Sequence, residues 1–173
     1  NIIRQTAMIA VMAVAMTFVL ASGEIDLSIG AVAGLTTVTV AMAIAVAGPL
    51  AGVLAGIATG IAVGCFNGWL TTRIGIPSFL TTLAMMGIAK GVAMWISDTA
   101  AVPILSPGYS WAFGGGSIGP VPVLLFWMLV AGALGHFVLR RTGFGRRVLA
   151  TGGGETAARY SGIDTANIKF KVL

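Results

Sequence analysis

Long apolar runs without a single charge are the feature that most constrains this chain. Of its 173 residues, 57% are hydrophobic and only 9% are charged, whereas a soluble domain carries about a quarter charged residues. A chain with so few charges could not cover its own surface with side chains that water solvates. The composition therefore predicts an integral membrane protein.

Five segments are long and apolar enough to cross a bilayer as helices. Such a helix needs about 20 apolar residues, with a working range of about 17 to 25. The fold class that we predict is an all-α, polytopic helical bundle with about five transmembrane helices. They are expected over residues 6–22, 29–47, 49–71, 78–97 and 122–139, and a sixth is expected to begin after Asp164.

The basic residues predict the orientation of these helices. Arg140, Arg141, Arg146 and Arg147 directly follow the fifth segment, so that end is expected to be cytoplasmic. The loop 98–121 has no Lys or Arg, which suits the outer face. Counting back places four further sites in turn: Arg73 inside, the Gly48-Pro49 turn outside, residues 23–28 toward the cytoplasm and Arg4 outside.

The net charge of +5 is explained by this clustering and not by nucleic-acid binding, which we do not expect. Cys65 is the single cysteine, so an internal disulfide is excluded. The sequence starts without Met and without a signal-peptide pattern, which suggests a chain entered partway along.

The third segment contains a repeating small residue, with one glycine every four positions. Each step of four advances about 40° around an α-helix, so the stripe winds around the helix axis. We expect two neighbouring helices to share this stripe, each approaching closely because no side chain intervenes. The alternative is that glycine is simply common in membrane helices. The predicted packing residues are Gly52, Gly56, Gly60, Gly64 and Gly68.

No motif predicts catalysis or a bound cofactor. The run 152–154 is followed by Glu155-Thr156 and not by Lys, so it is no phosphate-binding loop, and we expect it and the run 114–116 to form turns. His136 is the single histidine and has no carboxylate at ligand spacing, so no metal site is expected. The chain is predicted not to be an enzyme.

Two carboxylates, Glu24 and Asp26, stand between the first two apolar segments with no basic residue beside them. One interpretation is helix capping, in which Asp26 or Ser28 accepts hydrogen bonds from the N–H groups that open the second helix. The other is a proton or ion site, because a carboxylate at membrane depth is costly. The position at the edge of a span favours capping.

Lys90 is the one charged residue inside a predicted span. Its ammonium could line a polar path, or its long stem could reach outward toward Asp98. Thr81 and Thr82 add hydroxyl groups at the other end of the same helix, after a Pro77-Ser78 helix start. Asp26, Ser28, Thr81, Thr82 and Lys90 are the candidate residues of a translocation path.

The loop 140–164 is predicted to contain a short helix over residues 155–161. Glu155 suits its positive end, Gly162 is placed to close it, and Asp164 is placed to cap the next span. A short helix exposed in the cytoplasm is suited to docking a partner, and an ordinary ordered connector is the alternative.

Five sequence blocks, in order, resemble the permease subunits of ribose-type ABC importers, which carry simple sugars. The resemblance covers nearly all 173 residues and leaves out the family's first span and its later spans, so the chain is expected to be roughly half of a permease, a single transmembrane domain over 1–173. The blocks are Gly23-x-Ile25-Asp26-Leu27-Ser28-x-Gly30, Phe66-Asn67-Gly68-x-Leu70, Ile76-Pro77-x-Phe79-x-x-Thr82-Leu83, Arg141-Thr142-x-Phe144-Gly145-Arg146 and Gly152-Gly153-x-Glu155-x-Ala157-Ala158-Arg159-x-Ser161-Gly162-Ile163.

The resemblance implies import of a monosaccharide or similar solute across the bacterial cytoplasmic (inner) membrane. The implied partners are two ATPase subunits that bind the ATP, a second permease subunit and a periplasmic or tethered sugar-binding protein. The short helix would be the coupling helix that docks on the ATPase, although Gly154 stands where Asn is more usual. The residues that this role implies are Glu155, Thr156, Ala158, Arg159, Ser161 and Gly162.

Two other classes compete with this interpretation. An ion-coupled secondary transporter would need carboxylates in the membrane, and Glu24 and Asp26 are the ones that could serve. A structural or receptor membrane protein is the third class, and the same five blocks disfavour it.

Overall fold

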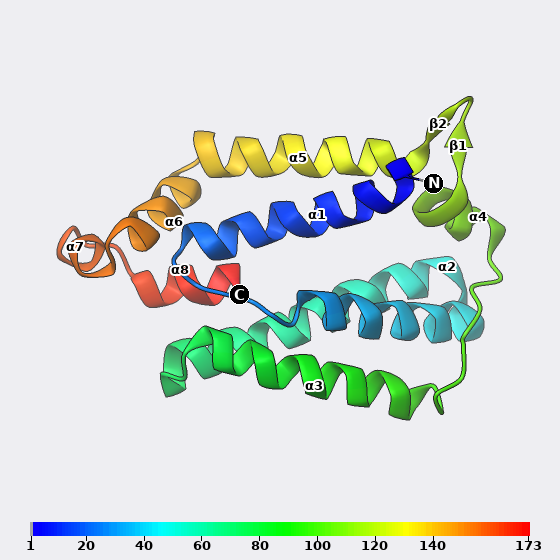
Figure 1. The fold of residues 1–173 in the computed structure, drawn as a ribbon, viewed down its shortest axis with the longest axis horizontal. Helices are drawn as coiled ribbons and strands as arrows, with labels where there is room; N and C mark the ends of the chain where they lie inside the picture. The colour runs from blue at the N-terminus through cyan, green and yellow to red at the C-terminus, as the bar shows by residue number, and fades with distance from the viewer. Residues whose placement is uncertain (1) are drawn as a thin grey trace.

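Four helices within residues 2–173, the part that this computed structural model describes, are long and apolar enough to cross a membrane. They are α1 (Ile2–Ala21), α2 (Ile29–Trp69), α3 (Ser78–Ile96) and α5 (Val123–Arg141). Their bounds lie within a few residues of the predicted segments, and the predicted all-α membrane fold is confirmed (Figure 1).

Helix α2 contains two of the five predicted spans, because the chain reverses direction within it. At Gly48 the backbone has φ 83° and ψ −177°, which is not helical, and Pro49 follows. The two halves then lie against each other, and the hydroxyl groups of Thr39 and Thr59 are 3.0 Å apart. A wider π-helical turn, η1 (Leu70–Ile74), extends the second half beyond the predicted end at residue 71.

The glycine stripe faces two neighbours, as the winding of the repeat predicts. A Cβ atom added to Gly56 would lie 2.9 Å from Val40 in the first half of α2, and one added to Gly52 would press on Ile44. Gly68 faces α8 (Thr165–Val172) instead, and Gly64 faces Leu173, which follows α8; added Cβ atoms would lie 3.0 Å and 3.2 Å from the backbone oxygens of Phe170 and Leu173. Gly60 has open space beside it.

The connection from α3 to α5 folds into small elements. They are α4 (Pro107–Ser110), the π-helical turn η2 (Trp111–Gly115) and a two-stranded antiparallel hairpin of β1 (Ser117–Ile118) and β2 (Val121–Pro122), with Ile118 opposite Val121. The expected turn at 114–116 is therefore wrong for Gly114 and Gly115, which end η2. The Arg4 guanidinium donates to the Gly115 carbonyl, which ties this connection to the start of α1.

Three short helices follow α5: α6 (Gly143–Gly153), α7 (Glu155–Tyr160) and α8. Helix α6 was not predicted, and it includes Gly152 and Gly153, for which a turn was expected. Thr142 caps it, because its side chain accepts a hydrogen bond from the N–H of Gly145. A helix, α8, begins after Asp164, whose carboxylate accepts from the N–H of Asn167 at 3.0 Å, as the predicted cap requires. Its eight residues are shorter than a membrane span, so the sixth span stays a prediction.

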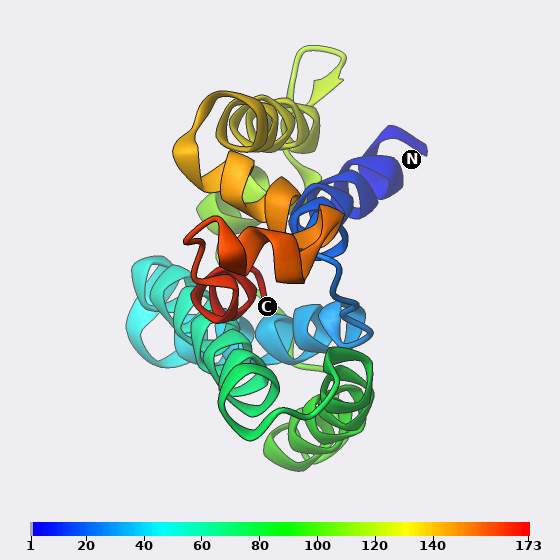
Figure 2. The same cartoon turned by 90° about the vertical axis from the view of Figure 1, so that its left-hand side faces the viewer.

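The molecule has two pairs of long helices joined by α8. Helix α1 packs on α5, and α2 packs on α3, where Ala31, Leu35 and Ala89 form a small buried core. Figure 2 shows α8 lying between α6 and the second pair. At one end of the molecule lie α6, α7 and η1, and the 22–28 segment runs from this end of α1 back toward the middle, where α2 begins (Figure 1). The Gly48 turn, α4 and the hairpin lie at the other end, so the ends alternate as the predicted topology requires (Figure 1).

The long helices keep most of their apolar residues at the surface. Between 6% and 22% of the residues in their most apolar stretches are buried inside the chain. Exposed apolar surface on this scale is unfavourable in water, so lipid tails and other apolar helices are the surroundings that these helices require.

Candidate functional site

The predicted two-turn helix is present as α7, at the far end of the molecule from the Gly48 turn (Figure 1). Gly154 precedes it in an extended conformation, Glu155 occupies its first turn, and Gly162 follows it with φ +81°. The N–H of Ile163 donates to the Ala158 carbonyl, so the chain reverses tightly after the helix.

One face of α7 is anchored and the rest is open to solvent. Ala158 is 4% exposed and packs inward, whereas Tyr160, two residues further along the helix, is 89% exposed. Of the residues predicted to dock the ATPase, Ala158 therefore holds the helix in place and cannot be reached in this conformation. The open ones are Thr156, Arg159, Ser161 and Gly162, with Glu155 half-buried.

A cluster of charges fixes α7 to the helix that follows. One oxygen of Glu155 accepts from the Arg159 guanidinium at 2.7 Å and from the Thr165 hydroxyl at 3.2 Å. The other oxygen accepts from the Lys169 ammonium at 2.8 Å. The same ammonium lies 2.6 Å from the carboxylate of Glu24, which precedes α2.

The ionisation of this cluster follows from its contacts. The hydrogen bond from Lys169 holds the pKa of the Glu155 carboxyl below its ordinary value, with the charges of Lys169 and Arg159 acting in the same direction and partial burial opposing them. Burial acts to lower the pKa of Lys169, but its bonds to Glu155 and Glu24 and the charges of both outweigh burial and raise it. Both side chains are charged at neutral pH.

The segment 22–28, between α1 and α2, is held by hydroxyl groups at the start of α3. The N–H of Ile25 donates to the Ser78 hydroxyl at 3.1 Å, and the N–H of Leu27 donates to the Thr82 hydroxyl at 3.0 Å. The backbone of Gly23 lies against Gly152 of α6. This non-helical stretch is therefore fixed from both sides.

The predicted capping of α2 is only partly observed. Ser28 is the N-cap residue, but its side chain accepts no hydrogen bond from the opening turn. Asp26 instead accepts from the N–H and the hydroxyl of Ser28, each at 2.7 Å. The buried amide of Asn67 donates to the Ser28 hydroxyl at 3.3 Å, which ties the start of α2 to its end.

The other candidate path residues all lie on α3, with Thr81 and Thr82 near its start and Lys90 toward its other end. Thr82 is fully buried and Thr81 nearly so, and the Thr81 hydroxyl has no hydrogen-bond partner among the described residues. Lys90 is exposed on α3 and forms no ion pair within residues 2–173, with Asp98 or otherwise. The role of these residues, and of Asp26 and Ser28, in translocation stays a prediction.

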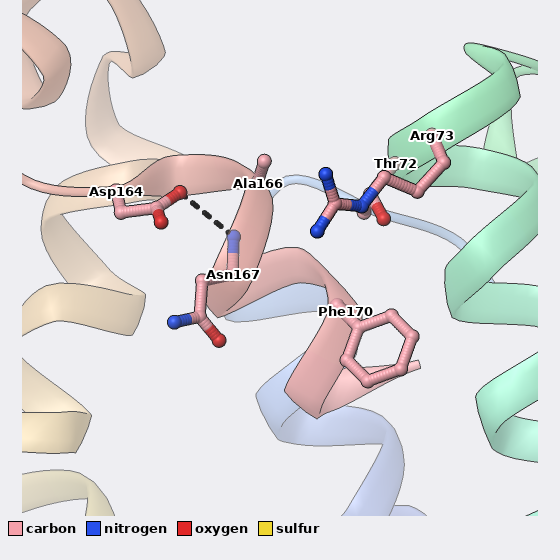
Figure 3. A pocket seen from close by; sticks show the side chains of 6 residues that line it. All are labelled: Thr72, Arg73, Asp164, Ala166, Asn167 and Phe170. Carbon is pink, nitrogen blue, oxygen red and sulfur yellow. Dashed lines mark hydrogen bonds between the residues drawn. The ribbon is translucent and has the colours of Figure 1, made fainter.

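A polar hollow of about 380 Å³ opens between η1 and the start of α8. Figure 3 shows the guanidinium of Arg73 pointing from η1 toward Asn167, with Asp164 bonded to the backbone at the start of α8. The remaining lining residues are Thr72, Ala166 and Phe170. Arg73 thus adds a basic group to the end of the molecule at which α7 lies.

Sequence reasoning did not single out Lys169. The missing signal was long-range, because Glu24 and Lys169 are 145 positions apart and come together only through the packing of α8. The nearer pair, Glu155 and Arg159, has the i,i+4 spacing that predicts contact on a helix, and this pair is formed.

The comparisons with known proteins agree on the class of this chain. The family described as "Branched-chain amino acid transport system / permease component" matches residues 1–173. No solved structure matches the chain.

Among curated proteins, the chain is 37% identical to the "Ribose import permease protein RbsC" of Bacillus subtilis, over 99% of the chain and 54% of that protein. It is 36% identical to the "Inner membrane ABC transporter permease protein YjfF" of Escherichia coli, over 99% of the chain and 54% of the relative. The "L-arabinose ABC transporter permease protein AraH" of Azospirillum brasilense is 36% identical, over 100% of the chain and 51% of the relative.

The chain thus spans about half the length of the curated relatives that it matches. The resemblance to permeases of simple-sugar importers is confirmed by the names of these relatives. The helical membrane architecture and the family match over every residue lead to one conclusion: the chain belongs to the permease-component family of ABC transport systems.

Proposed function

We propose that this chain is part of the transmembrane permease subunit of an ATP-driven importer of a monosaccharide or similar small polar solute. Separate ATPase subunits bind and hydrolyse the ATP, a second permease subunit completes the pathway, and a periplasmic or tethered sugar-binding protein delivers the solute. The protein resides in the bacterial cytoplasmic membrane as a multi-pass protein.

The observation that carries the proposal is the match to permeases named for ribose and L-arabinose along almost the whole chain. The family description names amino acids, so the substrate class rests on these relatives. The structure adds helices that are long and apolar enough to span a bilayer and a solvent-exposed short helix at one end.

Helix α7 is the element that we assign to docking on the ATPase. It is short, it is anchored by the Glu155–Lys169 contact and by buried Ala158, and it exposes Thr156, Arg159 and Tyr160. An exposed arginine and tyrosine on a fixed support are the residue types that contribute most to protein interfaces. The hollow beside Arg73 offers a second polar surface at the same end.

An ion-coupled secondary transporter is less well supported. That class requires a carboxylate that is free to exchange a proton or bind an ion. Glu24 is paired with Lys169, and Asp26 is occupied by the N–H and hydroxyl of Ser28. Both candidate carboxylates thus have structural partners.

The test is uptake by vesicles that contain the full-length permease, its ATPase and its binding protein. Labelled ribose, arabinose, xylose and a branched-chain amino acid are supplied one at a time, with ATP, ADP or an imposed proton gradient as the energy source. We expect ATP-dependent accumulation of a sugar. Accumulation driven by the proton gradient without ATP, or of the amino acid alone, would refute the proposal.

A further inference from the structure

We propose that Lys169 is a positioning residue that transmits movement of α7 to the 22–28 segment and from there to α2 and α3. This inference rests on the proposed function, because it concerns how the docking helix acts on the membrane helices. The argument depends on one ammonium group that two carboxylates from distant parts of the chain share.

Lys169 bonds both to α7 and to the segment that precedes α2. Its ammonium lies 2.6 Å from a Glu24 oxygen and 2.8 Å from a Glu155 oxygen, so one cation binds both carboxylates. The side chains of Glu24 and Lys169 are 9% and 19% exposed. This end of the contact is shielded from water and salt, whereas the Arg159–Glu155 pair is largely solvated.

The burial of Glu24 makes the contact resist separation. Separating a buried carboxylate from its cation is strongly unfavourable, because it leaves an uncompensated charge in a poorly solvated site. When α7 is displaced, Lys169 is drawn with Glu155 and α8, and Glu24 is favoured to follow it. A solvated pair would separate at little cost.

Beyond Glu24 the connection continues through the backbone of its own segment. Two of the next three amides along the chain, those of Ile25 and Leu27, donate to the Ser78 and Thr82 hydroxyl groups at the start of α3. Ser28 binds Asn67 near the end of the second half of α2. A shift of Glu24 thus acts on one end of α3 and on both halves of α2.

Helix α6 supports the same segment by packing. Gly152 lies against the backbone of Ala21 and Gly23, so no side chain separates α6 from the start of the segment. The backbone contact fixes the position of the segment, and the ionic contact is what joins it to α7. The two contributions are separable by mutation.

The experiment compares uptake per ATP hydrolysed in the reconstituted complex of full-length permease, ATPase and binding protein. The main variant is the double substitution Glu24→Gln with Lys169→Gln, which leaves no unpaired buried charge at this contact. We expect the ATPase to copurify and ATP to be hydrolysed, while uptake per ATP falls at least about fivefold, the lower range of coupling between two sites.

Two further substitutions separate positioning from folding. Lys169→Arg retains a cation that can bind two carboxylates, so uptake per ATP should return toward the wild-type value. Lys171→Gln is the matched control, because Lys171 is exposed on the same helix and forms no ion pair within the described chain. It should leave the ratio unchanged.

The outcomes are distinct. If the double variant transports as many molecules per ATP as Lys171→Gln, Lys169 transmits nothing and the inference is overturned. If the double variant loses the ATPase altogether, Lys169 only holds the docking surface, and the inference is again wrong. If the wild-type complex shows no ATP-driven uptake, the proposed function fails, independently of these variants.

Discussion

Gly152 lies in the last turn of α6, where the helix crosses the end of α1. A Cβ atom at this position would press on the carbonyl of Ala21 and lie 3.0 Å from the nitrogen of Gly23. Both neighbours are backbone atoms, which cannot rotate away as a side chain can. The contact between α6 and the 22–28 segment therefore depends on the absence of one methyl group.

We predict that Gly152→Ala lowers the stability of the protein by about 1 to 3 kcal/mol, the usual cost of overpacking. Thermal unfolding of the detergent-solubilised protein measures this. The control is Gly153→Ala, because an added Cβ there meets nothing within 4 Å and alanine favours a helix. Equal unfolding temperatures for the two variants would contradict the assigned contact.

The error at this position has a physical origin. A run of three glycines favours a turn by local preference, because glycine destabilises a helix by about 1 kcal/mol relative to alanine. Gly152 and Gly153 nevertheless belong to helix α6. Glycine stands at position 152 because the end of α1 approaches too closely for a side chain. That approach is a tertiary contact, which no local pattern reveals.

In helix α2, too, the local sequence predicts the helix boundaries, whereas the packing partners depend on tertiary contacts. Its two halves were predicted as separate spans from apolar length and from Gly48-Pro49, and this was correct because both residues punctuate helices locally. The partners of the glycine stripe were predicted in number but not in identity. That one partner is α8 follows only from the folded structure.

We predict that Gly48→Ala destabilises the α2 hairpin by about 1 to 3 kcal/mol, because φ 83° with ψ −177° is a conformation reserved for glycine. The yield and unfolding temperature of the purified protein report this change. Gly34→Ala is the control, since Gly34 is helical and an added Cβ there has open space. A Gly48→Ala protein as stable as the Gly34→Ala protein would show that the reversal at Gly48 is wrong.

The contact between α7 and α8 should depend on pH only at the extremes. Glu155 has a lowered pKa, so its contribution is complete above the ordinary value of 4.5 and is lost as pH falls through the lowered pKa. Lys169 has a raised pKa, so its contribution is complete below 10.5 and is lost as pH rises through the raised pKa.

We therefore expect the mobility of α7 to be constant between about pH 5 and pH 10 and to increase outside this range. A fluorophore on Tyr160→Cys, in a Cys65→Ala background, reports that mobility through its anisotropy. Glu155→Gln should abolish the acid transition. A change in anisotropy near neutral pH in the unsubstituted cluster would contradict the assignment.

At the scale of the whole molecule, two helix pairs meet through α8 and the cluster around Lys169. Composition and apolar length predicted the membrane class and the spans, because both depend on local sequence. Local residues predicted α7, the resemblance gave it a docking role, and its i,i+4 ion pair follows from helix geometry. The joining of the two pairs could not be predicted, since Glu24 and Lys169 gave no local sign of contact.

The most direct test of the account is sugar-stimulated ATP hydrolysis by the reconstituted complex with Arg159→Ala, compared with wild type and Lys171→Gln. If α7 docks on the ATPase, loss of this exposed arginine should reduce stimulated hydrolysis at least about tenfold, as expected for truncating an interface hot spot, with membrane insertion intact. Normal hydrolysis together with normal sugar import in Arg159→Ala and Glu155→Gln proteins would contradict the account.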